Sequence, residues 1–137
     1  MPFVLLCLLA LGVSTCSGPV QESALLQKEP GETWIRTELL FGLSRPGGAP
    51  VSEQEWRDFL GQEVTPRFPD GLTVVEAYGQ YLNSAKTQVR EGSKLLLILY
   101  PPDPASSAKI EQIRTAYKKR FHQESVLRST SLSKVSF

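Results

Sequence analysis

The sequence predicts a single α+β domain in which two helices cover one antiparallel sheet. Strand-like segments with alternating apolar residues are separated by two segments in which apolar residues recur at helical spacing. A run of five aliphatic residues, Leu95–Leu99, is apolar on both faces and indicates a central strand. The 137 residues, 41% of them apolar, are enough for one domain with a hydrophobic core.

The first strand is expected from Trp34 to Leu43, because its side chains alternate in character. The odd-numbered positions form the set that should face the core: Ile35, Thr37, Leu39, Phe41 and Leu43. Arg36 and Glu38 then fall on the opposite face. A loop rich in proline and glycine follows at residues 45–50.

The first helix is expected from Ser52 to about Thr65. Ser52 is a good N-cap, and Glu55 three residues later completes a capping box. Val51 and Trp56 occupy the positions of a hydrophobic staple. Pro66 disfavours helical geometry in the residue before it, so the helix should end there.

Two further strands are predicted at residues 72–81 and 94–100, with the polar residues 83–92 as the hairpin connection between them. The second helix should span residues 104–121, since Asp103 and Pro104 fit an N-cap followed by the first helical position. A last strand is expected around Ser125–Arg128, with a short additional piece at Val135–Phe137.

The resulting order is β-α-β-β-α-β. Right-handed crossovers across both β-α-β units give a four-stranded antiparallel sheet with both helices on one face. This is a ferredoxin-like arrangement, in which the first and third strands are central.

The N-terminus indicates export. Residues 3–13 form an apolar run that is too short to span a membrane but fits a signal-peptide core. The stretch Val13–Cys16 resembles a bacterial lipobox, so residues 1–16 are interpreted as a signal with Cys16 lipidated. A cleaved signal without lipid, or a buried strand or helix, are the alternatives. Residues 17–32 are expected to be a flexible tether before a domain at 33–137. The protein should therefore reside in the cell envelope or periplasm.

Several runs resemble an uncharacterised family of small exported bacterial proteins, a domain of unknown function (family three-five-seven-four). They are Thr37–Gly42, Val51–Trp56, Glu63–Val74 and Gln123–Arg128. The resemblance implies one complete domain over about residues 34–137 and an export signal. It implies no activity.

Candidate binding residues come from the sheet face that the helices would leave open. The proposed set is Arg36, Glu38, Tyr78, Gln80 and Tyr100, with Glu76 beside them. If they share this face, they form a polar pocket with acid, base and hydrogen-bonding groups. The alternative is an ordinary solvated face or one buried in a dimer.

Other chemistry has little support in the sequence. Both cysteines, Cys7 and Cys16, lie in the predicted signal, and His122 is the single histidine, so no metal site is expected. No nucleotide-binding glycine pattern or nucleophile elbow is present, and no cofactor is predicted. The basic residues of the second helix, such as Lys118 and Lys119, are interpreted as a solvated helix face, and nucleic-acid binding is not expected.

Two functions follow as hypotheses. The first is a non-catalytic module of the bacterial cell envelope that binds a small ligand or an envelope protein, anchored to the membrane if Cys16 is lipidated. The second is a small enzyme that uses a pocket on the open sheet face, with a homodimer as one way to enclose it.

Overall fold

The computed structural model describes residue 24, residues 26–82 and residues 84–137. Its elements are β1 (Glu32–Gly42), α2 (Glu53–Phe59), a π-helical turn (Leu60–Val64), β2 (Thr73–Leu82), β3 (Gln88–Tyr100), α3 (Pro104–Phe121) and β4 (Leu127–Val135). The predicted signal segment, with Cys16, and half of the predicted tether lie outside the described residues.

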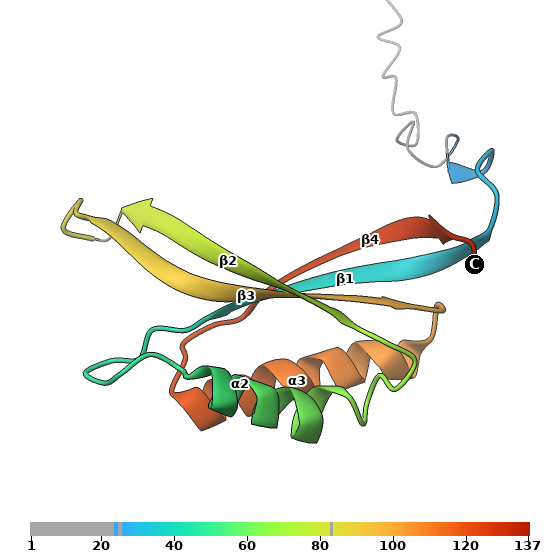
Figure 1. Ribbon diagram of the computed structural model, residues 1–137. Coiled ribbons are helices and arrows are strands. Elements are labelled where there is room, and N and C mark those ends of the chain that lie inside the picture. The colour runs from blue at the N-terminus through green and yellow to red at the C-terminus, as the bar shows by residue number, and fades with distance from the viewer. Residues whose placement is uncertain (1–23, 25, 83) are drawn as a thin grey trace, which may run out of the picture.

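The four strands form one antiparallel sheet in the order β2-β3-β1-β4. Both helices lie against the same face of this sheet, and the other face is left open (Figure 1). The predicted ferredoxin-like fold is therefore confirmed, with β1 and β3 in the centre.

The core forms between the sheet and the two helices, around an aromatic cluster. Thr37, Leu39 and Phe41 of β1 are fully buried on the helix side. The Phe41 ring centroid lies 5.2 Å from that of Trp56, 5.9 Å from that of Phe59 and 4.6 Å from that of Tyr117. Leu60, at the start of the π-helical turn, is only partly buried against this core.

Two strands are longer than the sequence predicted. β3 begins at Gln88, inside the segment predicted as a hairpin connection, and β2 and β3 together form an arm that extends past the helices (Figure 1). β4 is continuous over Leu127–Val135, where only short pieces at its two ends were predicted. Both misassigned segments are polar and so lack the apolar alternation that identifies a strand. The start of β3 lies beyond the helices, and β4 is an edge strand, so neither needs a continuous apolar face.

α2 begins at the predicted capping box. The backbone N–H of Ser52 donates to Glu55 Oε2 at 2.9 Å, and the backbone N–H of Glu55 donates to Ser52 Oγ at 3.3 Å. Arg45 also forms a 2.6 Å ion pair with Glu55. Hydrogen bonds from Arg45 and Ser52 lower the pKa of Glu55 to about 2.

Ser52→Ala should reduce the free energy of unfolding by about 1 kcal/mol, because the N-cap acceptor is lost. Chemical denaturation at equilibrium measures the change. Ser136→Ala is the control, since Ser136 is exposed beyond β4 and its loss should change stability by less than about 0.5 kcal/mol. Equal effects of the two substitutions would contradict a stabilising cap.

Candidate functional site

The pairing of β1 with β3 decides which predicted site residues face the open side. Residues directly opposite each other in a ladder share a face. The buried Thr37 lies opposite Ile98, which is also fully buried on the helix side. Arg36 and Glu38 therefore lie on the open face, as predicted, where Arg36 Nη2 is 2.6 Å from Glu38 Oε1.

Tyr100 lies on the other face, which corrects the prediction that it joins Arg36 and Glu38. It pairs with Ile35 on the helix side and is 5% exposed. Its hydroxyl is 2.8 Å from Thr37 Oγ1, so Tyr100 belongs to a buried hydroxyl contact between the two central strands.

Tyr78 and Gln80 also occupy alternate positions of β2 that lie on the helix side of the sheet, not on the open face. Glu76, two residues before Tyr78, lies opposite Lys94 in the β2–β3 ladder and forms an ion pair with it. Tyr78 and Gln80 lie further along the arm, where both are exposed and Gln80 Oε1 accepts a 2.7 Å hydrogen bond from Arg90. The five predicted residues are thus divided between two faces, because the registers of β2 and β3 cannot be read from the residues of each strand alone.

A cavity of about 600 Å³ lies instead at the end of the open face where β1 ends. The sheet is incomplete at this point, because β3 continues to Gln88 without β1 beside it. The cavity walls come from the ends of β1 and β2, from β3, from the start of β4, and from the loops that precede α2 and follow α3.

Hydrogen-bond acceptors converge at one point in this cavity, above Gly42. A Cβ atom placed on Gly42 would lie 3.4 Å from each carboxylate oxygen of Glu91 and 3.5 Å from Gln123 Oε1. The side-chain nitrogen of Gln123 donates to the carbonyl oxygen of Ser44, which orients its Oε1 away from that bond. Because Gly42 has no side chain, the space in front of its Cα atom, beside these three oxygens, is not filled by a side chain of its own.

Ser93 adds a buried hydroxyl to the same cavity. It pairs with Gly42 across the β1–β3 ladder and is 5% exposed. Within the described part of the chain, its Oγ has no hydrogen-bond partner. Buried polar side chains are ordinarily paired, so this hydroxyl indicates a place where a ligand group can bind.

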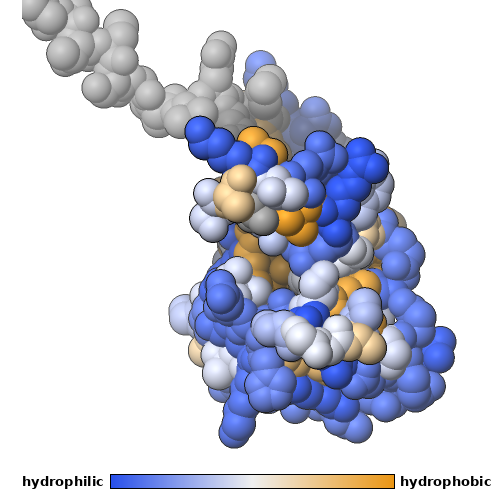
Figure 2. Space-filling view, turned by 90° about the vertical axis from the view of Figure 1, so that its left-hand side faces the viewer, coloured by the Kyte–Doolittle hydropathy of each residue, from blue (hydrophilic) through white to orange (hydrophobic). Residues whose placement is uncertain are grey.

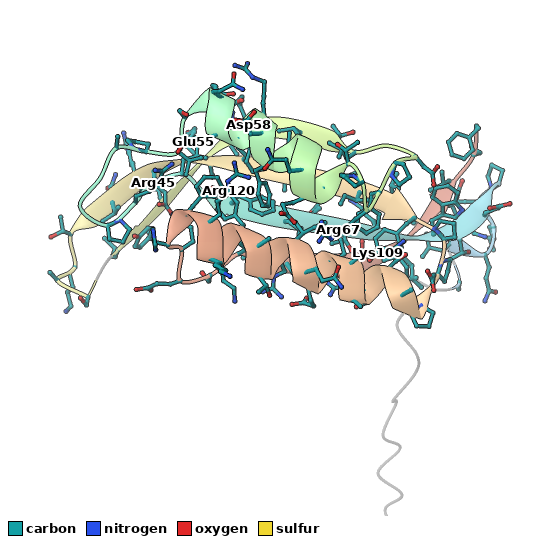
Figure 3. The ribbon with its side chains drawn as sticks, turned by 90° about the horizontal axis from the view of Figure 1, so that it is seen from below. Arg45, Glu55, Asp58, Arg67, Lys109 and Arg120 are labelled. Carbon is teal, nitrogen blue, oxygen red and sulfur yellow. The ribbon has the colours of Figure 1, made fainter. Side chains whose placement is uncertain are left out.

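Contacts on the helix side hold the cavity end of the sheet in place. The Tyr117 hydroxyl donates to the carbonyl oxygen of Gly42 at 2.8 Å, and burial raises the pKa of Tyr117. Arg45 lies over the Phe121 ring at 5.3 Å as well as beside Glu55 (Figure 3). His122 ends α3 with a left-handed backbone, φ 55°. This turn directs the chain into the loop at residues 122–125, which lines the cavity.

The remaining wall is apolar. Leu40, Tyr81 and Leu127 line the cavity and are 37%, 52% and 56% exposed. Figure 2 looks onto this end of the molecule and shows apolar residues in a recess between two largely polar parts of the surface. The cavity thus combines acceptor oxygens on one side with an apolar wall on another.

Glu91 was missed because residues 83–92 were predicted as a polar connection, and Ser93 and Gln123 were not assigned to any site. A usable signal was present: Glu91 and Ser93 continue the two-residue alternation of Leu95, Leu97 and Leu99 along the open face.

Residues 24, 26–82 and 84–137 contain no group of three or more His, Cys, Asp or Glu side chains placed to hold a metal ion. No helix among them is long and apolar enough to cross a membrane.

The fold is similar to that of two solved structures of a phage SAM lyase. The structure in complex with S-methyl-5'-thioadenosine is 17% identical, with a TM-score of 0.57, and the match covers 82% of this chain and 96% of that chain. The apo structure is 16% identical, with a TM-score of 0.55, over 80% of this chain and 96% of that chain. At these identities the likeness shows the fold alone.

No curated protein sequence matches the chain. A family profile described as "Protein of unknown function (DUF3574)" matches residues 36–137, which include every strand and helix of the domain, β1 in part. The resemblance found in the sequence is therefore confirmed, and the chain belongs to this family of proteins of unknown function.

Proposed function

We propose that this protein is a non-catalytic binding module whose ligand is a small organic cation, held in the cavity by a protonated amine above Gly42. The observation that carries the proposal is that three acceptor oxygens lie together beside Gly42, which has no side chain to fill the space in front of them. The family gives no activity with which to compare it.

The charges and hydrogen bonds at this point favour a donor with a positive charge. An ionised Glu91 only accepts hydrogen bonds, and in the described part of the chain it has no ion pair with a lysine or arginine. Gln123 Oε1 is a further acceptor, and Ser93 Oγ can accept or donate. An ammonium group has three donors and no acceptor, so it satisfies these oxygens better than a neutral or anionic group.

The apolar wall suggests the rest of the ligand. Leu40 and Leu127 would contact hydrocarbon, and the exposed ring of Tyr81 would favour a cation or a planar group nearby. A cavity of about 600 Å³ lies in the range typical of small-molecule sites, about 300–1,000 Å³.

The proposal is tested with a panel of amines of increasing size, such as putrescine and phenethylamine, and with acetate and phosphate as anionic comparisons. Calorimetry and thermal denaturation should show binding of cations only. A ligand present at 100 times its Kd should stabilise the fold by about 2.7 kcal/mol.

Gly42→Ala tests the proposed site most directly, because the added methyl group fills the space beside the three acceptor oxygens. Its backbone has no positive φ, and the new atom would meet only ordinary van der Waals contacts, so the fold should be retained. Binding should weaken about 10- to 100-fold, as it should in Glu91→Gln, which removes the charge. Gly61→Ala is the control, since a Cβ there meets nothing within 4 Å.

Two results would overturn the proposal. One is that no cation in the panel binds. The other is that Gly42→Ala and Glu91→Gln bind the amines as tightly as Gly61→Ala.

A small enzyme is the second candidate, favoured by the likeness to the phage SAM lyase. S-adenosylmethionine carries an ammonium and a sulfonium cation, so it fits the class of ligand proposed for the cavity. Incubation with S-adenosylmethionine, followed by chromatography for S-methyl-5'-thioadenosine, separates the candidates. Product that disappears in Glu91→Gln would support the enzyme, and binding without product would support the module.

The proposed location is the bacterial cell envelope, with Cys16 as a lipid anchor. It is supported by the apolar run at residues 3–13 and the lipobox-like stretch that ends at Cys16. Cell fractionation tests it: the wild-type protein should be found with membranes, and Cys16→Ser should not.

A further inference from the structure

The open face of the sheet is apolar over much of its area. Four of its side chains are between 37% and 56% exposed: Leu40, Val75, Tyr81 and Leu127. The register places Leu95, Leu97 and Leu99 on the same face, where they are partly buried. Both helices lie on the other side (Figure 1), so no described element covers the centre of this face.

We propose that a second copy of this chain covers the open face, in a two-fold symmetric homodimer. The argument rests on the charges in the middle of the face. Arg36 and Glu38 lie on it two residues apart along the central strand β1, so their Cα atoms are about 7 Å apart.

The Arg36–Glu38 pair of one protomer is complementary in charge to the same pair of a second protomer that runs in the opposite direction. A two-fold axis that passes near Thr37 places Arg36 of each protomer against Glu38 of its partner. The two chains then bury opposite charges next to each other, and the side chains of Val75, Leu95, Leu97 and Leu99, which do not line the cavity, pack around them. The same surface patch serves both subunits, as a two-fold interface requires.

The size of the face is adequate for such an interface. Four strands about 4.8 Å apart and about 7 residues long give a flat area of about 450 Å². Because side chains protrude from the sheet, the accessible surface area is larger than this flat area and approaches the roughly 800 Å² per partner of a standard interface. At one end Phe137 lies against Trp34, with ring centroids 5.6 Å apart, which leaves the centre of the face uncovered.

Sedimentation velocity over a range of protein concentrations tests the proposal. The wild type should dimerise. Arg36→Glu and Glu38→Arg should each weaken dimerisation about tenfold or more, because each places like charges opposite each other. The double variant Arg36→Glu/Glu38→Arg should restore it, since the swapped charges again face their opposites.

Val75→Lys is an independent variant that introduces a charge into the apolar part of the face and should abolish the dimer. Val75 is 47% exposed on an edge strand, so the monomer should remain folded, which circular dichroism checks. Lys119→Glu, on the exposed side of α3, is the control and should dimerise as the wild type does.

The proposal fails if the wild type is a monomer at every concentration. It also fails if the wild type dimerises and Val75→Lys, or either single charge reversal, dimerises equally well.

Discussion

Phe41→Ala should lower the free energy of unfolding by about 3–5 kcal/mol, which is a large part of the stability of a small domain. Phe41 is fully buried at the centre of the aromatic cluster, and it joins the sheet to both helices. Removal of the ring loses its burial and leaves a cavity that the rigid neighbours Trp56, Phe59 and Tyr117 cannot fill. Denaturation by urea, with the slope m compared between variants, measures the loss.

Phe137→Ala is the matched control, because it is the same substitution at a fully exposed position. The Phe137 ring is fully exposed beside Trp34 at one end of the open face, so the loss should be below about 0.5 kcal/mol. If Phe41→Ala proves too unstable to purify, Phe41→Leu retains most of the volume and should cost about 1–2 kcal/mol. Similar losses from Phe41→Ala and Phe137→Ala would show that the cluster is not the core.

The sequence predicted the fold because its local signals agree with each other. Ser52 and Glu55 form the expected capping box, and Asp103 accepts from the backbone N–H of Ala105 at 3.0 Å, as an N-cap should. The alternation in β1 identified the residues that face the helices. β4 was incomplete in the prediction because it is an edge strand rich in serine, with little apolar alternation.

The candidate site could not be predicted in the same way, because it depends on register between strands. Tyr100 and Arg36 were assigned to one face, yet a displacement of one residue moves a side chain to the other face. The acceptors at Gly42 come from residues 49 and 81 positions away in the sequence, Glu91 and Gln123. No local pattern in any of these three segments indicates that they meet.

Lys94 illustrates the same limit, since no local pattern indicated that its side chain is buried. It is 1% exposed on the helix side, and its ammonium group donates to Glu53 at the start of α2 and to Glu76 on β2. Burial alone would lower the pKa of Lys94, but the hydrogen bonds to the two carboxylates outweigh it and raise the pKa. The stem of Lys94 lies opposite Phe41 in the ladder, so it packs as part of the core.

Three substitutions separate the contribution of this stem from that of the charge. Lys94→Ala should cost about 2–3 kcal/mol, because about three buried methylene groups are lost at about 0.8 kcal/mol each. Lys94→Met retains the volume and should change stability by less than about 1.5 kcal/mol. It removes only two ion pairs, whose carboxylates are 60% and 74% exposed and therefore well solvated.

Lys94→Glu should have the largest effect, at about 3–5 kcal/mol near pH 7, since it places a third carboxylate in a buried position between two others. The pKa of the introduced carboxyl should be raised in the folded state, so the loss should be complete above that pKa and diminish as the pH falls through it. Urea denaturation at several pH values measures this trend for all three variants. A Lys94→Met variant as unstable as Lys94→Glu would show that the ion pairs, and not the buried stem, hold α2 to the sheet. A pH-independent loss in Lys94→Glu would show that the introduced carboxyl escapes to solvent.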